Sequence, residues 1–418
     1  MGVFQDRGLT GMEAKRYRVI QNVIESKVSQ IEASGDLKIT TRHVRRLVNV
    51  VKSRGPEGVI HGLVGKRSNH AFKVEKEKQI LELWETKYRP CGLNFTHFTE
   101  KLNEKEGVSV SKEKVRVLLR ENGVVDVKPK KGRKHRKERV RRTQFGELLQ
   151  QDTSPHDWLG IGKVFHAVNV VDDATSKVLF LKLFEHDGTL ANMEAMRYVI
   201  LNYGLPMSYY VDKAAWFKVT RHFDATITKQ NSVDYGTQIE RALEELGIEL
   251  IWADSPQGKG RVERSNGTEQ NRLIAELKLR GIKTLEAANH YIETEFIRDY
   301  GQRFGVEPVD PSSAFVPFIG KAKLDRILCQ RFTSTVQNDN TISKSKYYKL
   351  QLLPTEYRQS WVKAPVEVSI MIDGAVEVRH ANTGNLIPFD VLELKSQREV
   401  KHQTIYRDIP EQLVERNK

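Results

Sequence analysis

Apolar and basic positions alternate at helical spacing through the N-terminal part of the chain. Residues 10–27 predict an amphipathic helix, and residues 41–52 predict another, for which Thr40 is a suitable N-cap. One face of helix 41–52 is apolar, and the opposite face carries Arg42, Arg45, Arg46 and Asn49. A short helical segment lies between the two helices, so the three together resemble a helix-turn-helix unit.

A second segment of the same kind covers residues 74–122. Its last predicted helix begins after Ser111, and the side opposite its apolar face carries Lys112, Arg116 and Arg120. Because the last helix of a helix-turn-helix enters the major groove, we predict that both basic helices bind DNA. The alternative is a pair of ordinary three-helix bundles whose charged faces are solvated.

Residues 128–142 contain almost no apolar side chains and cannot form a core. Lys130, Lys131 and Arg133 belong to this segment, which carries many cations and a single glutamate. We expect an extended tether that neutralises DNA phosphates. A linker that only solubilises the chain is the alternative.

From Phe145 onward, strand-like and helix-like stretches alternate. Strands are predicted at residues 146–152, 164–171, 178–184, 207–211 and 248–252. Helices are predicted at residues 190–203, 239–246 and 285–300, and from a cap at Ser255 to about Leu279. Three strands followed by alternating helices and strands predict an α/β sheet that begins as an antiparallel meander.

Short strands separated by glycine- and asparagine-containing turns fill the C-terminal part. They are predicted at residues 347–353, 366–372, 376–380 and 391–394, which is typical of a small all-β barrel or sandwich. The predicted domains are two helix-turn-helix domains at 1–70 and 71–127, a basic linker at 128–142, an α/β core at 143–317, and a small β-barrel-like domain with a polar tail at 318–418.

The composition of the chain favours a protein that binds an anionic polymer and excludes disulfide-rich and membrane-spanning proteins. The 418 residues carry a formal net charge of +14, which favours an anionic polymer as partner. Cys91 and Cys329 are the only cysteines, which excludes a disulfide framework and a Cys-rich zinc site. No apolar run approaches the roughly 20 residues of a membrane span, and the N-terminus has no apolar signal core. We therefore expect a soluble protein of the cytoplasm.

Three carboxylates fall where catalytic metal ligands are common. Asp152 and Asp212 each end a predicted strand, and Glu263 lies on the helix after Ser255. An oxygen-only cage of this kind suits Mg²⁺ or Mn²⁺, and two such ions can catalyse phosphoryl transfer. Lys259 and Arg261 would then hold the phosphodiester backbone. The alternatives are three unrelated surface carboxylates, or the rival ligands Asp157, Asp172 and Asp173, of which the last two are favoured as turn residues.

The segments around these carboxylates resemble a known family. Residues 151–153, 210–213 and 255–264 resemble the DDE triad of the integrase-core superfamily, which covers retroviral integrases and many bacterial transposases. Residues 151–158 and 171–176 add a resemblance to bacterial insertion-sequence transposases of the ISNCY group. The resemblance implies a ribonuclease-H-like fold for residues 143–317, Mg²⁺ or Mn²⁺ as cofactor, and catalytic metal ligands at Asp152, Asp212 and Glu263.

Two departures from the family pattern follow Asp212. Lys213 and Ala214 stand where the family usually has Asn-Gly, which leaves a neighbouring backbone-positioning role undefined. The spacing from Asp212 to Glu263 exceeds the retroviral one, and an inserted polar segment at 218–234 accounts for the excess.

The function that this resemblance implies is DNA transposition. Residues 1–142 would bind the terminal inverted repeats of a mobile element, and the carboxylates would support strand cleavage and strand transfer. We expect double-stranded DNA as partner and a homodimer or higher oligomer, because two ends must be paired, on the nucleoid of a bacterial cell. The alternatives are a DNA-binding regulator with an inactive integrase core and a structure-specific nuclease of the same fold.

Overall fold

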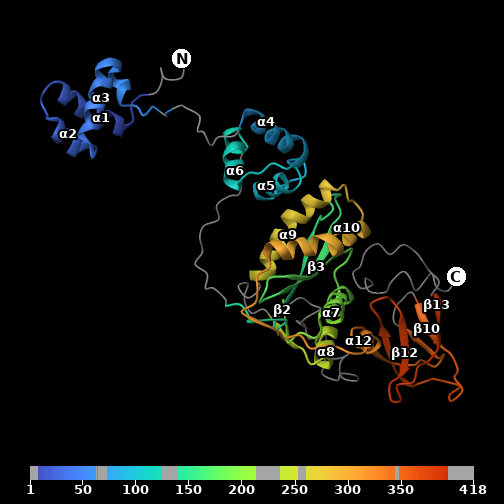
Figure 1. The fold of residues 1–418 in the computed structure, drawn as a ribbon. Helices are drawn as coiled ribbons and strands as arrows, with labels where there is room; N and C mark the ends of the chain where they lie inside the picture. Colours follow the sequence, from blue (N-terminus) through green and yellow to red (C-terminus); the bar gives the residue numbers. More distant parts are fainter. Residues whose placement is uncertain are drawn as a thin grey trace, which may run out of the picture. The chain divides into compact units, whose positions relative to one another are not determined.

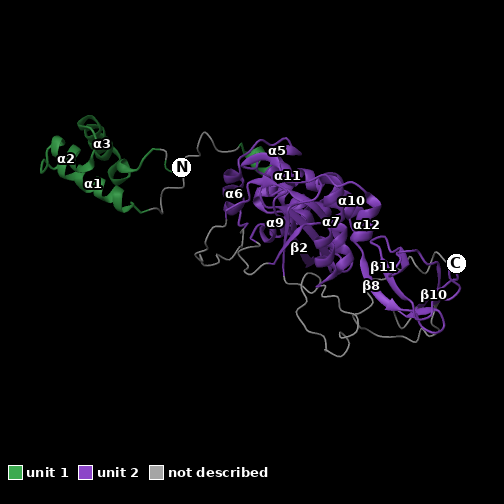
Figure 2. Cartoon of the chain, turned by 90° about the horizontal axis from the view of Figure 1, so that it is seen from below, with its two compact units in different colours: residues 1–80 green, residues 81–418 purple. Residues whose placement is uncertain are grey.

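The computed structural model describes residues 8–62, 64, 73–124, 140–212, 236–252, 260–343 and 348–393. The chain divides into two compact units, residues 1–80 and 81–418 (Figure 2). Several segments singled out in the sequence lie outside the described residues: Lys130, Lys131 and Arg133 of the basic linker, the insertion 218–234, the cap at Ser255, Lys259, and the tail after residue 393. Within the described residues, the helices are too short or too polar to span a membrane.

The first unit is built on a three-helix bundle. Its helices are α1 (Gly11–Ile24), α2 (Gln30–Leu37) and α3 (Thr41–Arg54), followed by the 3-10 helix η1 (Gly55–Val59) (Figure 1). The apolar face of α3 packs with Ile20 and Ala33 to form its core. Each of the three α-helices begins at a side-chain cap, with Thr40 accepting a hydrogen bond from the backbone of His43 ahead of α3. The predicted cap and helix are therefore confirmed.

A second helical segment opens the larger unit. Helix α4 (Val74–Leu83) crosses the boundary between the units and continues as the π-helical turn η2 (Trp84–Tyr88). Helices α5 (Phe95–Glu104) and α6 (Lys112–Glu121) follow, and Ser111 caps α6 as predicted. Aromatic side chains fill the space between η2 and α5, where Trp84 lies 5.5 Å from Phe95 and 5.0 Å from Phe98 between ring centroids.

The α/β core is a five-stranded sheet with the order β4-β3-β2-β5-β6. Its strands are β2 (Leu149–His156), β3 (Phe165–Asp172), β4 (Val178–Phe184), β5 (Ser208–Val211) and β6 (Glu249–Trp252). The first three pair antiparallel, and β2, β5 and β6 pair parallel. The predicted α/β sheet with an initial antiparallel meander is confirmed, and the arrangement fits a ribonuclease-H-like core.

Helices cover both faces of this sheet. One apolar cluster joins β3 and β5 to α7 (Thr189–Tyr203) and α8 (Gln238–Glu245). The other joins β3 and β4 to α9 (Gly260–Leu279) and to the helical run α10 (Leu285–Tyr291), η4 (Ile292–Phe296) and α11 (Ile297–Phe304). Along β3, Phe165, Ala167 and Val171 belong to the cluster on the α9 side, whereas Val168 and Val170 face the other side.

The C-terminal region contains two three-stranded antiparallel sheets. They have the orders β12-β11-β8 and β13-β10-β9 and enclose a core around Trp361 and Val366. The strands are β8 (Gln330–Thr335), β9 (Thr341–Ser343), β10 (Tyr348–Leu352), β11 (Pro365–Ile370), β12 (Val376–His380) and β13 (Phe389–Glu393). The sequence did not predict β8, β9 or the preceding helix α12 (Lys321–Ile327), because they are short and largely polar. A further two-stranded sheet pairs β1 (Gln144–Phe145) with β7 (Asp310–Ser313).

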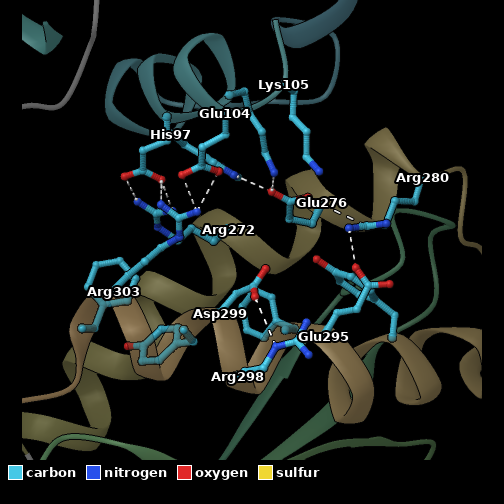
Figure 3. Close-up of a pocket in the computed structure, with 16 residues that line it drawn as sticks. His97, Glu104, Lys105, Arg272, Glu276, Arg280, Glu295, Arg298, Asp299 and Arg303 are labelled. Carbon is cyan, nitrogen blue, oxygen red and sulfur yellow. Dashed lines mark hydrogen bonds and ion pairs between the residues drawn. The ribbon is translucent and has the colours of Figure 1, made fainter. Parts of the chain in front are cut away.

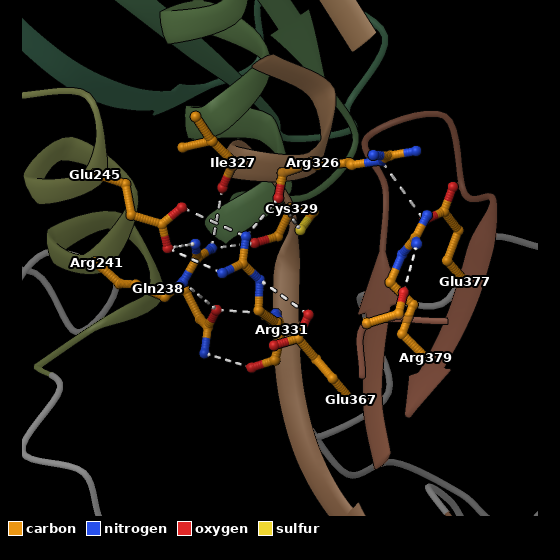
Figure 4. A network of polar contacts seen from close by, with 11 residues as sticks. Gln238, Arg241, Glu245, Arg326, Ile327, Cys329, Arg331, Glu367, Glu377 and Arg379 are labelled. Atoms are coloured by element: carbon orange, nitrogen blue, oxygen red, sulfur yellow. Dashed lines mark hydrogen bonds and ion pairs between the residues drawn. The ribbon is translucent and has the colours of Figure 1, made fainter. Parts of the chain in front are cut away.

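Helix α8 is joined to strand β8 by a polar network (Figure 4). The buried Arg241 donates to the carbonyl oxygens of Ile327 and Cys329, at 3.0 Å and 2.7 Å. Arg331 pairs with Glu245 at 2.9 Å. These contacts fasten the first strand of the C-terminal sheets to the α/β core.

Candidate active site

Asp152 lies within β2, which continues to His156 and does not end at Asp152 as predicted, whereas Asp212 directly follows the end of β5. Strand β2 pairs with β5 so that Leu149 is opposite Tyr209 and Gln150 is opposite Tyr210. Asp152 and Asp212 each lie two residues beyond the last of these paired positions. Both aspartates are partly buried. Asp212 thus lies at the carboxyl end of a parallel strand, where an open α/β sheet commonly places a site.

Glu263 lies in the first turn of α9 and is exposed. The described part of this helix begins at Gly260, and the predicted cap at Ser255 lies outside the described residues. A buried contact ties this turn to β2, because the backbone N–H of Val262 donates to Oε1 of Gln150 at 3.1 Å. The three carboxylates thus come from adjacent elements. Among the described residues, however, no three His, Cys, Asp or Glu side chains are close enough together to hold a metal ion.

Arg261 is engaged inside the protein. Its side chain is only 12% exposed, and its Nε lies 3.5 Å from Oδ1 of the fully buried Asp173. The same oxygen of Asp173 accepts a hydrogen bond from Nε2 of Gln150 at 2.7 Å. The group Gln150, Asp173 and Arg261 therefore joins the start of α9 to the sheet beside Asp152 and Glu263. Arg261 was predicted to bind DNA, and the structure places its guanidinium in this internal contact.

The other rival ligands use their oxygens in turns. Buried Asp172 accepts hydrogen bonds from the backbone of Gly146 at 2.9 Å and of Thr175 at 2.7 Å, and burial raises the pKa of its carboxyl. Asp157 accepts from the backbone of Ile161 and Gly162, and the bond from Gly162 is the main cause that lowers the pKa of Asp157. These are the contacts of turn residues, as favoured for Asp172 from the sequence.

Sequence reasoning missed a buried polar network beside Asp152. Nδ2 of Asn266 donates to Oδ2 of Asp152 at 2.8 Å. Oδ1 of Asn266 accepts from Nδ2 of Asn169 at 3.1 Å. The same Nδ2 lies 2.8 Å and 3.0 Å from the two carboxyl oxygens of Glu269. Asn169 and Glu269 are 0% exposed, and Asn266 is 8% exposed.

Glu269 has a strongly perturbed pKa. Burial raises it to about 7, against the lowering effect of hydrogen bonds from Ser265 and Asn169, and the negative charge of Asp152 raises it further. Oγ of Ser265 donates to Oε1 of Glu269 at 2.6 Å and lies 3.1 Å from the hydroxyl of Tyr300. The sequence held one signal for this network: Asn169 interrupts the apolar row of β3 that faces α9.

Helix α5 is bound to the C-terminal half of α9 by ion pairs (Figure 3). Oε1 of the buried Glu276 lies 2.6 Å from Nε2 of His97 and 2.5 Å from Nζ of Lys101. Burial alone would raise the pKa of Glu276, but these two partners lower it to about 2. The guanidinium of Arg272 binds both carboxyl oxygens of Glu100, at 2.7 Å and 2.8 Å. Helix α5 is thereby attached to the helix that carries Glu263.

The predicted DNA-binding faces are solvent-facing for the most part. On α3, the four predicted contact residues are all exposed: Arg42, Arg45, Arg46 and Asn49. Arg45 also donates from Nε to Oε1 of Gln30 at 3.2 Å. On α6, Lys112 and Arg120 are exposed, whereas Arg116 is partly buried and paired with Glu113.

Comparison with known proteins identifies the family. No protein-family model matches the chain. It is 30% identical over 396 residues to transposase y4bF of Sinorhizobium fredii, covering 94% of this chain and 83% of the relative. It is 29% identical over 327 residues to the transposase for insertion sequence IS1202 of Streptococcus pneumoniae, covering 70% of this chain and 68% of the relative.

Solved structures of retroviral integrases align with the chain at low similarity. The simian T-cell lymphotropic virus intasome in complex with PP2A regulatory subunit B56 gamma matches 77% of this chain and 100% of that chain, with 13% identity and a TM-score of 0.31. The trimeric HTLV-2 integrase catalytic core domain in complex with magnesium matches 36% of this chain and 85% of that chain, with 15% identity and a TM-score of 0.26. The sequence relatives carry the assignment: the chain belongs to the transposase family that includes y4bF.

Proposed function

We propose that this transposase cleaves and joins DNA strands at the ends of a mobile element, with Asp152, Asp212 and Glu263 as its catalytic carboxylates. The observation that supports the proposal is the parallel pairing of β2 with β5 at Gln150 and Tyr210, two residues before each aspartate. The bond from Val262 to Gln150 adds the start of α9, and with it Glu263, to the same neighbourhood.

The donor set fits a hard divalent cation. Asp152, Asp212 and Glu263 offer only carboxylate oxygens, which Mg²⁺ and Mn²⁺ prefer over nitrogen or sulfur ligands. When bound, two such ions supply Lewis-acid stabilisation of the attacking and leaving oxygens in phosphoryl transfer. In this proposal the chain holds Asp152 on β2, Asp212 directly after β5, and Glu263 on α9.

Two in-line phosphoryl transfers make up the proposed reaction. Water first attacks the phosphorus at an element end, the bond to the 3′-oxygen breaks, and a 3′-hydroxyl and a 5′-phosphate result. That 3′-hydroxyl then attacks a phosphodiester of target DNA, forms a new bond to its phosphorus, and releases a 3′-hydroxyl of the target strand. Each step exchanges one phosphorus–oxygen bond for another, so the same carboxylates serve both steps.

Recognition of the ends is assigned to the N-terminal 142 residues. The exposed Arg42, Arg45 and Asn49 of α3 have side chains suited to base contacts in the major groove. Helix α6 offers Lys112 and Arg120, and the basic linker supplies contacts to phosphates without sequence preference. Because two element ends must be brought together, we include a homodimer or higher oligomer on double-stranded DNA in the proposal.

Substitution of the carboxylates tests the chemistry. Asp152→Asn, Asp212→Asn and Glu263→Gln keep the side-chain shape but remove one anionic ligand each. Each variant should lose strand cleavage and strand transfer by on the order of 10³-fold or more, the scale seen for catalytic groups. Duplexes carrying the inverted repeats that flank the gene, with Mg²⁺ or Mn²⁺, provide the substrate, and a gel resolves the products.

The control variant is Asp157→Asn, which alters a nearby turn aspartate and should cleave at close to the wild-type rate. End binding, measured by mobility shift, should persist in all four variants. Near-normal cleavage by one of the three carboxylate variants removes that residue from the proposed triad. A wild-type protein that binds ends without cleaving them would instead be a regulator, and cleavage without end preference or joining would indicate a nuclease.

A further inference from the structure

The polar network beside Asp152 lies in an otherwise apolar layer between β3 and α9. Asn169 occupies a strand position whose neighbours on the same face, Ala167 and Val171, are apolar core residues. Glu269 lies on α9 one turn before the core residue Leu273. Burying amide and carboxyl groups costs free energy unless hydrogen bonds replace their contacts with water. Backbone groups of a strand and a helix are already paired, so these side chains depend on one another for hydrogen bonds, although Oδ1 of Asn169 finds no partner among the described residues.

The two amide groups donate the hydrogen bonds that link Asp152 to Glu269, and those of Asn169 diverge toward Asn266 and Glu269. An ionised Asp152 can only accept, so Asn266 turns its Nδ2 toward Asp152 and its Oδ1 toward Asn169. That oxygen can also only accept, so Asn169 turns its own Nδ2 toward it. The same Nδ2 reaches both oxygens of Glu269. The orientation of the two amides is thus set by the carboxyl groups at the two ends.

We propose that Glu269 is a positioning residue for the catalytic carboxylate Asp152, acting through Asn169 and Asn266. The inference rests on the proposed function, since it takes the catalytic role of Asp152 from there. A carboxyl at position 269 holds the Asn169 amide in the one orientation that presents a donor to Asn266. Asn266 in turn keeps its own donor on Oδ2 of Asp152 and so restricts rotation of that carboxylate.

Glu269 is a buried carboxyl with neutral hydrogen-bond partners and a raised pKa, which is typical of residues at functional sites. Its hydrogen-bond partners among the described residues are the neutral side chains of Asn169 and Ser265. Without cationic compensation, burial raises the pKa of this carboxyl to about 7, so its ionisation opposes folding at neutral pH. Strong pKa shifts of this origin are concentrated at functional sites.

Divalent-ion binding by the full-length protein tests the inference without relying on turnover. Mn²⁺ binding is measured by paramagnetic resonance titration of the wild type and of Glu269→Leu, Glu269→Gln and Asp152→Asn. Leucine fills a similar volume but cannot accept a hydrogen bond, so Asn169 loses its anchor. We expect Glu269→Leu to weaken Mn²⁺ binding about 10–100-fold, the usual effect of losing a partner of a metal ligand. Glutamine retains an acceptor oxygen and should restore binding to within about threefold of the wild type.

The matched control is Glu276→Gln, which changes another buried carboxyl of α9 that contacts α5. It should lower the melting temperature while leaving Mn²⁺ binding within about threefold of the wild type. Glu269→Leu should show the reverse pattern, with weak Mn²⁺ binding and a melting temperature at or above that of the wild type.

Wild-type Mn²⁺ affinity in Glu269→Leu, with weakened binding in Asp152→Asn, overturns the positioning role and leaves the proposed function standing. Unaltered Mn²⁺ affinity in Asp152→Asn overturns the metal site itself, and the positioning role with it. The two failures are therefore distinguished by one set of titrations.

Discussion

Glu269 and Glu276 lie two turns apart on α9, and both are buried, yet their surroundings have opposite effects. Glu269 contacts the neutral side chains of Asn169 and Ser265, and its pKa is raised to about 7. Glu276 contacts Lys101 and His97, and its pKa is lowered to about 2. One helix thus carries a carboxyl whose ionisation opposes folding, beside the proposed catalytic edge, and another whose ionisation supports the attachment of α5.

The largest expected effect is on the attachment of α5. Glu276→Gln leaves Lys101 and His97 in a buried site without their carboxylate partner. Breaking a buried pair from one side costs about 3–5 kcal/mol, so the free energy of unfolding should fall by about that amount. Urea denaturation at pH 7 measures it.

The control for this loss is Glu85→Gln, which breaks the exposed pair between Glu85 and Arg89. Exposed pairs contribute about 0–1 kcal/mol, so this variant should be close to the wild type. Equal losses in the two variants would show that the contacts of Glu276 do not hold α5 on α9.

The pH dependence of stability is the next largest effect, and the two glutamates should differ in sign. For Glu269, the folded pKa of about 7 exceeds the ordinary 4.5, so the folded state keeps a proton that the unfolded chain has released. The free energy of unfolding should therefore fall between pH 4.5 and 7, by up to about 1.4 kcal/mol per pH unit. For Glu276, stabilisation is complete above pH 4.5 and is lost as the pH falls toward 2.

Urea denaturation of Glu269→Gln at pH 5, 6, 7 and 8 isolates the first of these contributions. The stability of the variant relative to the wild type should rise steadily from pH 5 to pH 7 and level off by pH 8. A difference that does not change with pH would mean that Glu269 ionises in the folded protein as easily as in the unfolded chain.

The smallest effect concerns a third buried carboxyl, Asp173, which has a cationic partner at the start of α9. Arg261→Ala removes that partner but leaves the hydrogen bond from Gln150, so a loss of about 1–3 kcal/mol is expected. Arg264→Ala is the matched control, because Arg264 is exposed on the same turn and should change stability by less than about 0.5 kcal/mol. Thermal melting of both variants provides the comparison. Equal melting temperatures for Arg261→Ala and the wild type would argue against an internal role.

Much of the core could be predicted from the sequence because its elements are marked locally. The strand at Val178–Phe184 and the caps Thr40 and Ser111 are found where apolar runs and capping residues predicted them. Strands β8 and β9 escaped prediction because they are short and polar, so their strand conformation depends on pairing with β11 and β10. The local pattern of apolar and polar residues does not predict which distant strands will pair.

In the candidate site, too, some residues could be predicted from the sequence and others could not. Asp152, Asp212 and Glu263 were singled out from strand ends and a glycine-rich helix start, and their catalytic role stays a prediction. Glu269 was not singled out, since a glutamate on a helix is most often solvent-exposed. Its role depends on Asn169, which lies 100 positions earlier in the chain, and only the folded sheet brings the two side chains together.

Helix α9 also sets the distance between the proposed catalytic residue Glu263 and the attachment site of α5 at Glu276. Glu276 lies 13 positions after Glu263, and at the helical rise of about 1.5 Å per residue this is about 20 Å along the axis. Glu276 and Arg272 attach α5 to the C-terminal part of this helix. A DNA segment bound by α5 and α6 would therefore lie at a fixed distance from the proposed catalytic carboxylates. The length of this helix, rather than the bases at the cut, would then set the distance between the bound DNA sequence and the position of the cut.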